Sequence, residues 1–290
     1  MLFRSLSFDF TRIGDPGRPT DSRSFAQFSP RLALVVLPTP GVSVKLMAAR
    51  AFRAPSPTEL AGAHTFSLAS NIDQLRPELV TTWEAAAEWR IARWLTARAN
   101  IFLTKFENQI AYSAQNNNLS TNLYSLKTEG AETEVLFSAG AVSGFVNYSY
   151  ARRLDEKIQD VTIAPSPNRL TWAPAHTANA GVTATWNPFT IGLSTHIQSR
   201  VDRRASDVGV QALPFGVGVQ LDMDRYRGDH VPSWVTVDLK ASARLFGSGE
   251  VALSVTNLLD REYSLVKVGP FPFDYTQEGR RFLVWGSWGF

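Results

Sequence analysis

The sequence has no cysteine among its 290 residues, and this absence excludes disulfide bonds and thiolate metal sites. It also has no stretch approaching the ~20 consecutive apolar residues of a membrane helix, which excludes helical membrane spans but not β-barrels. High net charge and scarcity of aromatics, two signs of disorder, are absent as well. The formal net charge is +3, and the chain has 18 Phe, 8 Trp and 7 Tyr. An ordered structure is therefore expected.

Charged residues are absent from the segment Leu170–Ser199, which Pro174 and Pro188 interrupt. These prolines argue against a helix. Apolar and polar side chains instead alternate from His176 to Trp186 and again from Phe189 to Gln198. A period of two is typical of β-strands, so the turn at Asn187-Pro188 predicts a tight hairpin.

The same alternation continues along the chain and predicts an all-β fold. We expect an antiparallel meander of about twelve transmembrane strands that forms a partial outer-membrane β-barrel. The expected strands cover residues 2–10, 25–37, 42–52, 78–91, 94–113, 121–137, 140–152, 174–186, 188–202, 233–246, 249–259 and 280–290. The first strand, Leu2–Phe10, and the last, Arg280–Phe290, are expected to be unpaired edges unless they close on each other.

Short and long connections alternate strictly between these strands. The short ones lie at Thr39–Gly41, Ala92, Ala139, Asn187 and Gly247–Gly249, and the long ones at 11–24, 53–77, 114–120, 153–173, 203–232 and 260–279. Outer-membrane barrels have short periplasmic turns on one rim and long loops on the other. The asymmetry therefore favours a barrel over a soluble β-sandwich.

The alternation also predicts which face of each strand meets lipid. The residues expected to point outward are Ala178, Val182, Ile191, Leu193, Val237, Leu239, Val251, Leu253 and Val284, and those expected in the lumen are Arg98, Asn100, Thr183, Ser194, Asp238, Lys240 and Arg244. Charged side chains suit a wet lumen better than a dry core. Aromatic residues near the strand ends are expected to form interfacial girdles; they are Trp83, Trp89, Trp94, Tyr148, Tyr150, Trp172, Trp186 and Trp234.

The last expected strand ends the chain on an aromatic residue. Phe282, Val284, Trp288 and the terminal Phe290 fall on one face of it. A terminal Phe on such a strand resembles the assembly signal of outer-membrane proteins. These four residues are therefore candidates for recognition by the barrel-assembly machinery.

Six further segments occur in a recognisable order. They are Ala51-Phe52-Arg53-Ala54-Pro55-Ser56-Pro57-Thr58-Glu59-Leu60, Leu75-Arg76-Pro77-Glu78 with Thr82-Trp83-Glu84, Phe106-Glu107-Asn108-Gln109-Ile110, Glu129-Gly130-Ala131-Glu132, Val255-Thr256-Asn257-Leu258-Leu259-Asp260-Arg261-Glu262-Tyr263 and Gly279-Arg280-Arg281-Phe282. Together they resemble the C-terminal half of the barrel of TonB-dependent outer-membrane receptors, from about Ser29 to Phe290. Their residues also have structural explanations, because Pro55 and Pro57 end a strand and Asn257 and Asp260 offer side-chain acceptors at a turn.

The resemblance implies active, TonB-coupled uptake of a scarce nutrient such as an iron–siderophore complex or cobalamin. Family members also carry an N-terminal plug domain and a TonB-contact segment, and neither is expected here; residues 1–24 fit the family poorly. We therefore expect residues 1–290 to be the C-terminal portion of a receptor barrel, a fragment that does not transport alone. TonB and the plug would be partners only of the intact receptor.

The expected location is the outer membrane of a Gram-negative cell, with outer-membrane lipid as a partner. Arg4, Ser5, Ser7 and Asp9 interrupt the apolar stretch that a signal peptide needs, so an export signal is not expected. A passive outer-membrane pore or structural barrel is the main alternative, and a membrane-embedded hydrolase is a third. The sequence does not identify the transported molecule.

No catalytic residue, metal site or cofactor is predicted. His64, His176, His196 and His230 lack ligand spacing, and His196 and His176 are interpreted as polar lining. Ser194, His196 and Asp238 lie on polar faces, but nothing in the sequence brings them together as a triad. Charged residues around Asp202-Arg203-Arg204 and Asp222–Asp229 could hold a charged ligand, although solvated loop charge is the simpler interpretation. Nucleic-acid binding is not expected, because the basic residues are dispersed.

Overall fold

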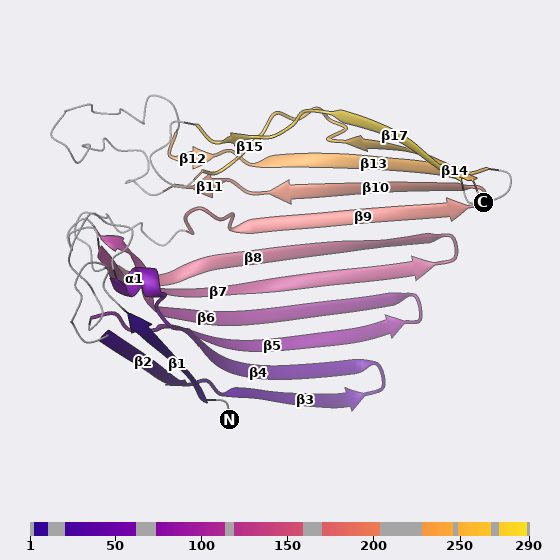
Figure 1. Ribbon diagram of the computed structural model, residues 1–290. Coiled ribbons are helices and arrows are strands. Elements are labelled where there is room, and N and C mark those ends of the chain that lie inside the picture. Colours follow the sequence, from indigo (N-terminus) through magenta and orange to yellow (C-terminus); the bar gives the residue numbers. More distant parts are fainter. Residues whose placement is uncertain are drawn as a thin grey trace.

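The structure is a computed structural model that describes residues 3–10, 21–61, 74–113, 119–158, 170–203, 228–245, 249–267 and 273–288. Most of the described chain forms one antiparallel sheet of eleven strands, in which each strand lies beside its sequence neighbours in that sheet (Figure 1). The strands are β3 (Arg31–Thr39), β4 (Val42–Arg53), β5 (Glu78–Ala92), β6 (Leu95–Ser113), β7 (Leu119–Ala139), β8 (Val142–Ile158), β9 (His176–Trp186), β10 (Phe189–Gln198), β13 (Trp234–Arg244), β14 (Gly249–Thr256) and β17 (Arg281–Trp288). The all-β antiparallel meander is thus confirmed.

Three small strand pairs lie outside this sheet. β1 (Phe3–Phe10) pairs with β2 (Asp21–Phe28), β11 (Val201–Asp202) with β12 (His230–Val231), and β15 (Ser264–Leu265) with β16 (Tyr275–Thr276). A single short helix, α1 (Pro57–Ala61), is present in the described residues. No helix in those ranges is long and apolar enough to span a membrane.

The edge prediction was wrong at the N-terminal side. Residues 3–10 pair with β2 and do not border the large sheet, whose edges are β3 and β17. The expected strand 25–37 is divided at Ser29-Pro30, where Pro30 offers no N–H to a ladder and its carbonyl accepts from the Arg50 amide at 2.9 Å. β2 therefore belongs to the hairpin with β1, and β3 begins after the break.

The connections sort onto two rims as expected. In Figure 1 the tight turns between β3 and β4, β5 and β6, and β7 and β8 lie on the right, which we call the turn rim. α1 and the small strand pairs lie at the opposite end, which we call the loop rim. The described C-terminal residues end at the turn rim.

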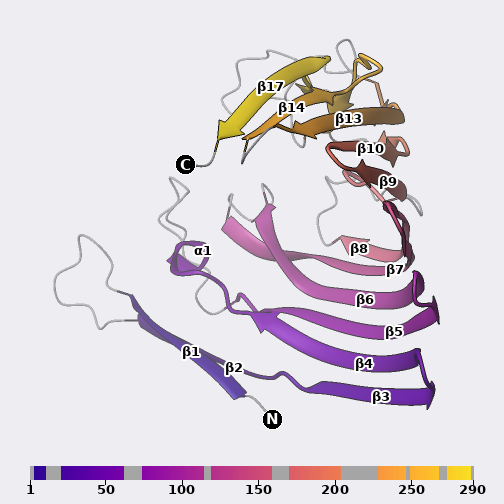
Figure 2. The same ribbon diagram turned by 90° about the vertical axis from the view of Figure 1, so that its right-hand side faces the viewer.

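The sheet is strongly curved, and Figure 2 shows its strands following an arc that is open on one side. Three glycines face phenylalanines directly across strand pairs: Gly130 faces Phe102, Gly144 faces Phe137 and Gly181 faces Phe145. A Cβ on each glycine would lie 2.4–2.6 Å from a ring or backbone atom of a neighbouring strand. Each ring therefore covers a backbone position where only glycine fits, a device typical of curved sheets.

The two faces differ in polarity in the way that the sequence predicts. Cross-strand register places Val182, Leu193, Leu239 and Val255 in one row, and the predicted outward residues all share this face. Arg53 lies on the opposite face of β4 and contacts Glu59 of α1 at 3.0 Å. Because α1 lies on the concave side (Figure 2), the apolar face is convex and the charged face is concave.

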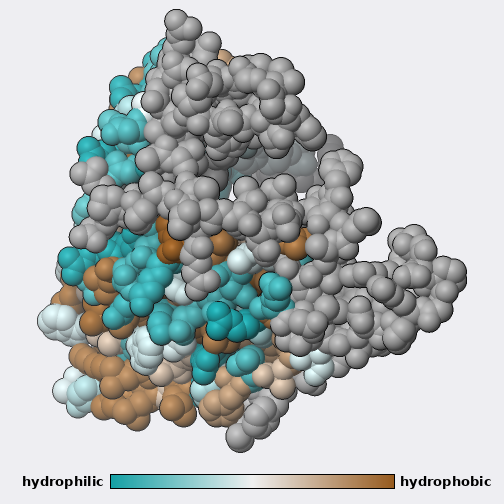
Figure 3. Space-filling model, turned by 90° about the vertical axis from the view of Figure 1, so that its left-hand side faces the viewer, coloured by the Kyte–Doolittle hydropathy of each residue, from teal (hydrophilic) through white to brown (hydrophobic). Residues whose placement is uncertain are grey.

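The convex face leaves large apolar side chains uncovered. Leu32, Ile101, Val146 and Val284 are each more than half exposed. Figure 3 views the loop rim and shows hydrophobic residues gathered toward the lower left, next to hydrophilic ones. A continuous apolar patch of this kind in a folded protein marks a surface that meets lipid or another molecule.

The few fully buried side chains lie near the loop rim. Phe25, Leu60 and Leu75 form a small cluster against which Ala54 and Ile110 pack. The cluster ties β2, α1 and the segment before β5 to one another. The sheet itself is a wall with little core of its own.

Candidate functional site

A row of polar side chains crosses the concave face from β4 to β13, and we call it the polar row. Each member is the cross-strand partner of the next, so all lie at one level of the sheet. In order, the members are Ser43, Glu88, Arg98, Glu134, Asn147, Asn179, His196 and Thr236. Of these eight residues, only Arg98 and His196 were expected in the lumen from the sequence. Parity along each strand would have placed the others on the same face, but their common level depends on the register between strands.

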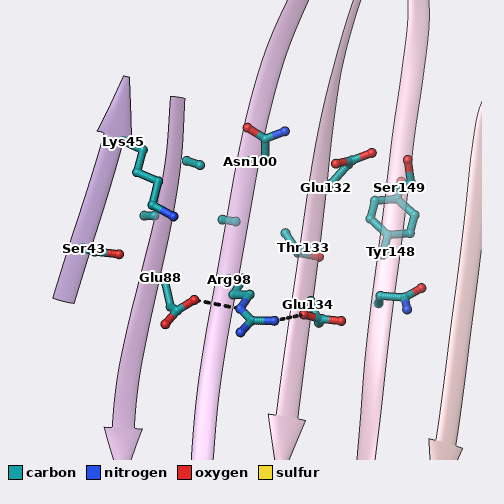
Figure 4. Close-up of a pocket in the computed structure, with 14 residues that line it drawn as sticks. Ser43, Lys45, Glu88, Arg98, Asn100, Glu132, Thr133, Glu134, Tyr148 and Ser149 are labelled. Carbon is teal, nitrogen blue, oxygen red and sulfur yellow. Dashed lines mark hydrogen bonds and ion pairs between the residues drawn. The ribbon is translucent and has the colours of Figure 1, made fainter. Parts of the chain in front are cut away.

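Arg98 holds the first part of the polar row together (Figure 4). Its Nε donates to Glu88 and its Nη1 to Glu134, both at 2.9 Å. These residues line a hollow of about 590 Å³ between β4 and β8, together with Lys45 and Glu132. About half of the Arg98 side chain remains exposed, so the guanidinium can also reach a molecule in the lumen.

The second part of the polar row is a chain of amide and imidazole hydrogen bonds. Asn179 donates through Nδ2 to Asn147 Oδ1 at 2.9 Å, and its Oδ1 lies 2.5 Å from His196 Nδ1. Asn179 Oδ1 can only accept, so His196 Nδ1 carries the proton. The imidazole of His196 also lies 4.9 Å from the ring of Trp234, which in turn lies 4.3 Å from Tyr263.

Trp234 corrects one sequence expectation. It was expected in an interfacial girdle, but it is buried on the concave face between His196 and Tyr263. Trp89 and Trp186, which lie close to the turn rim, are each about half exposed, as expected for a girdle. Tyr148 and His176 meet on the convex face, where Tyr148 Oη lies 2.6 Å from His176 Nδ1. His176 therefore faces outward and does not line the lumen.

The loop rim is locked by residues from the first two recognised segments. Arg53 donates to Glu78 Oε2 at 2.5 Å and to both carboxylate oxygens of Glu59. Ser56 and Glu59 form a capping box at the start of α1, with the Ser56 amide donating to Glu59 at 2.7 Å and the Glu59 amide donating to Ser56 Oγ. Glu78 also accepts from the Ile110 amide at 2.7 Å.

The charges of this lock are mutually stabilised. Burial alone raises the pKa of Glu59, but hydrogen bonds from Arg53 and Ser56 outweigh it and hold that pKa below its usual value. The pKa of Arg53 is raised, chiefly by its hydrogen bonds to Glu78 and then to Glu59. Arg53 and Glu59 therefore both stay charged at neutral pH.

Two asparagines complete the rim. Asn122 Oδ1 accepts from the Arg76 backbone amide and Asn122 Nδ2 donates to the Arg76 carbonyl, both at 2.9 Å. Nδ2 also donates to the Asn108 carbonyl at 2.7 Å. Asn257 is buried and has a φ of 53°. Its Oδ1 accepts from the backbone amide of Arg261 at 2.9 Å, and its backbone amide donates to Asp238 Oδ1. Asn257 was predicted as an acceptor at a loop stem, whereas the role of Asn122 was missed, because a lone Asn within an alternating strand carries no distinctive signal.

The other candidates do not assemble into a site. Ser194 and Asp238 are cross-strand partners with His196 nearby, but His196 Nδ1 bonds Asn179 and Asp238 bonds Asn257. Arg203 is buried and paired with Asp274, and residues 204–227 lie outside the described ranges, as does His64. No three His, Cys, Asp or Glu side chains of the described chain meet in a way that could hold a metal.

The candidate assembly residues lie on β17, except Phe290, which is outside the described ranges. Phe282, Val284 and Trp288 share the convex face and pair with Val255, Leu253 and Gly249 of β14. The other side of β17 borders no described strand. The recognition role of these residues stays a prediction.

Comparisons with known proteins agree with this architecture. A family model described as TonB dependent receptor-like, beta-barrel, matches residues 5–258. Three similar solved structures are the ferric-catecholate import receptor Fiu of Escherichia coli K12 (15% identity, TM-score 0.68, 93% of this chain and 36% of that chain), the copper transporter OprC (19%, 0.70, 97% and 42%) and the FrpB iron transporter of Neisseria meningitidis (16%, 0.69, 98% and 42%). At these identities the likeness shows the fold, and the chain spans about two fifths of each structure. No curated protein sequence matches the chain.

Proposed function

The chain belongs to the TonB-dependent receptor β-barrel family, and we propose that it forms the C-terminal part of an outer-membrane barrel for active nutrient uptake. The observation that carries this proposal is the curved sheet with an apolar convex face, a polar concave face and two open edges. Such a wall suits a bilayer on one side and a wide aqueous lumen on the other. It does not suit a soluble protein, because the convex face would be exposed to water.

The open edges support the view that the described strands are one part of a barrel. β3 and β17 each have a described partner on one side only, and both run from the loop rim to the turn rim (Figure 1). Closing them on each other would require one parallel pair in an otherwise antiparallel sheet. Additional strands between the two edges avoid this, because an odd number of them closes an antiparallel barrel.

The proposed cargo is an iron–siderophore complex or a similar scarce nutrient such as cobalamin. The similar structures include an import receptor for ferric catecholates and transporters for iron and copper. Uptake would require a plug and TonB, which act on the intact receptor. The proposed surroundings are outer-membrane lipid, with insertion by the barrel-assembly machinery through Phe282, Val284, Trp288 and Phe290.

A growth experiment tests this function against a passive pore, the main alternative. The chain, fused to a signal peptide, is expressed in a host that lacks its own siderophore receptors, beside a second version that includes the upstream coding sequence. We expect the longer version alone to restore TonB-dependent growth on siderophore iron. TonB-dependent growth from the chain alone would contradict the fragment assignment, and TonB-independent growth from the longer version would favour a pore.

A further inference from the structure

The convex face of β6 changes from uncharged to charged at one position. On β6, the outward residues from Leu95 to Leu103 are all uncharged, and the first charge is Lys105. Ten residues of strand rise ~33 Å, which spans about 25 Å of bilayer at a tilt of 35–45°. That span equals the usual apolar band of an outer-membrane barrel. Lys105 therefore lies where hydrocarbon gives way to lipid headgroups.

Two lysines meet at this level. Lys105 and Lys127 are direct cross-strand partners on β6 and β7, and like charges in this arrangement repel each other. Lys105 lies 2.7 Å from Glu107, while no described residue forms an ion pair with Lys127. Asp155 is the partner of Lys127 on β8, but the two charged groups do not approach within ion-pair distance.

A third cation and a layer of aromatic rings border the lysines. Arg152 lies on the same face of β8, and its Nε donates to Glu129 at 2.6 Å. Next to Arg152 on that face, the ring of Tyr150 lies 4.9 Å from that of His176. Aromatic rings of this kind mark the membrane–water interface, so the three cations lie just beyond it.

We propose that Lys105 and Lys127, with Arg152 beside them, bind the phosphate of an anionic lipid headgroup in the outer leaflet. This inference rests on the outer-membrane location proposed above. A phosphate oxygen on each lysine would relieve the repulsion between them and supply the partner that Lys127 lacks. A lipid fits better than free phosphate, because the outward residues of β6 below Lys105, from Leu103 to Leu95, are uncharged and offer its acyl chains an apolar track.

The test compares lipid binding by the full chain folded in dodecyl maltoside. Bound lipid is counted by native mass spectrometry with phosphatidylglycerol or phosphatidylcholine as the probe. We expect the unmodified chain to prefer phosphatidylglycerol and Lys105→Gln/Lys127→Gln to bind it roughly 30-fold more weakly, taking the usual contribution of one surface cation twice. The matched control is Lys45→Gln/Lys240→Gln, which removes two cations from the concave face and should leave binding unchanged.

Three results would overturn the proposal. The first is that Lys45→Gln/Lys240→Gln weakens phosphatidylglycerol binding as much as Lys105→Gln/Lys127→Gln does. The second is that the unmodified chain does not prefer phosphatidylglycerol to phosphatidylcholine. The third is that equimolar inorganic phosphate displaces the lipid, which would indicate a free-anion site. If the double variant fails to fold, Lys127→Gln and a salt titration of the unmodified chain replace it, and an unchanged preference in both would also contradict the site. A chain that inserts into vesicles through its convex face yet shows no headgroup preference would refute this site and leave the barrel assignment intact.

Discussion

Replacing Leu239 with arginine should destabilise the protein far more than replacing its neighbour Lys240 with arginine. Leu239 lies on the convex face between its cross-strand partners Leu193 and Val255. It lies five residues before Arg244, where β13 ends at the turn rim. Five residues of tilted strand rise about 12 Å, which places Leu239 near the middle of an apolar band of about 25 Å.

The expected cost follows from this depth. An arginine on the lipid face at the bilayer midplane lowers the free energy of unfolding by about 2–4 kcal/mol. No carboxylate lies directly across from position 239 to offset this cost, because its cross-strand partners are Leu193 and Val255. Lys240 points to the concave face, 5.6 Å from the ring of Trp285. An arginine there keeps both the charge and the ring contact, so Lys240→Arg should change the free energy of unfolding by well under 1 kcal/mol.

The assay is urea unfolding of protein folded in lipid vesicles, followed by tryptophan fluorescence. Both variants must first show the strand-rich circular dichroism of the unmodified chain. Equal destabilisation by Leu239→Arg and Lys240→Arg would refute the assignment of the two faces. A larger effect of Lys240→Arg would reverse it.

Further predictions concern packing, the rim and pH. Gly130→Ala places a Cβ 2.4 Å from the Tyr150 carbonyl oxygen and should cost about 1–3 kcal/mol in the same assay, whereas Gly192→Ala, with its nearest atom at 3.5 Å, should cost less. Asn257→Ala removes buried hydrogen bonds worth about 1–3 kcal/mol and should speed trypsin cleavage of the segment that follows it; unchanged cleavage would show that the asparagine does not hold the loop stem. The pKa of Glu59 is lowered from 4.5 in the folded protein. Its contribution to the free energy of unfolding is therefore present at neutral pH and is lost as the pH falls below 4.5 and through the lowered pKa. Glu59→Gln should therefore make the free energy of unfolding depend less on pH in the acid range. An unaltered pH profile would show that ionised Glu59 does not contribute to stability.

The fold was largely predictable because the membrane imposes a strict rule on each strand. Between His176 and Gln198 every second residue is apolar or small, and the structure pairs these residues as the parity requires, with Val182 beside Leu193. The same parity placed Arg98 on the concave face. The alternation within each strand was sufficient to predict its two faces, because every strand that crosses a bilayer presents apolar side chains to the lipid.

The sequence was less informative where the strands leave the bilayer. β8 was expected to end at residue 152, but the strand continues to Ile158 and includes the charged residues Arg153, Asp155, Glu156 and Lys157. Beyond the membrane, backbone hydrogen bonds to the neighbouring strands are sufficient to hold a strand, so charged residues do not end it. The contacts of the polar row and of Asn122 depend on register across strands far apart in the sequence, which one strand's pattern does not specify.

The central claim is that the sheet separates lipid on its convex face from water on its concave face. Because the chain has no cysteine, single-cysteine variants can be labelled with a fluorophore without background. Leu193→Cys and Ser194→Cys are neighbours on β10 with opposite faces. In vesicles, bromine-labelled lipid should quench the label at position 193 and leave the label at 194 to aqueous iodide. Equal quenching of both labels by either agent would contradict the account.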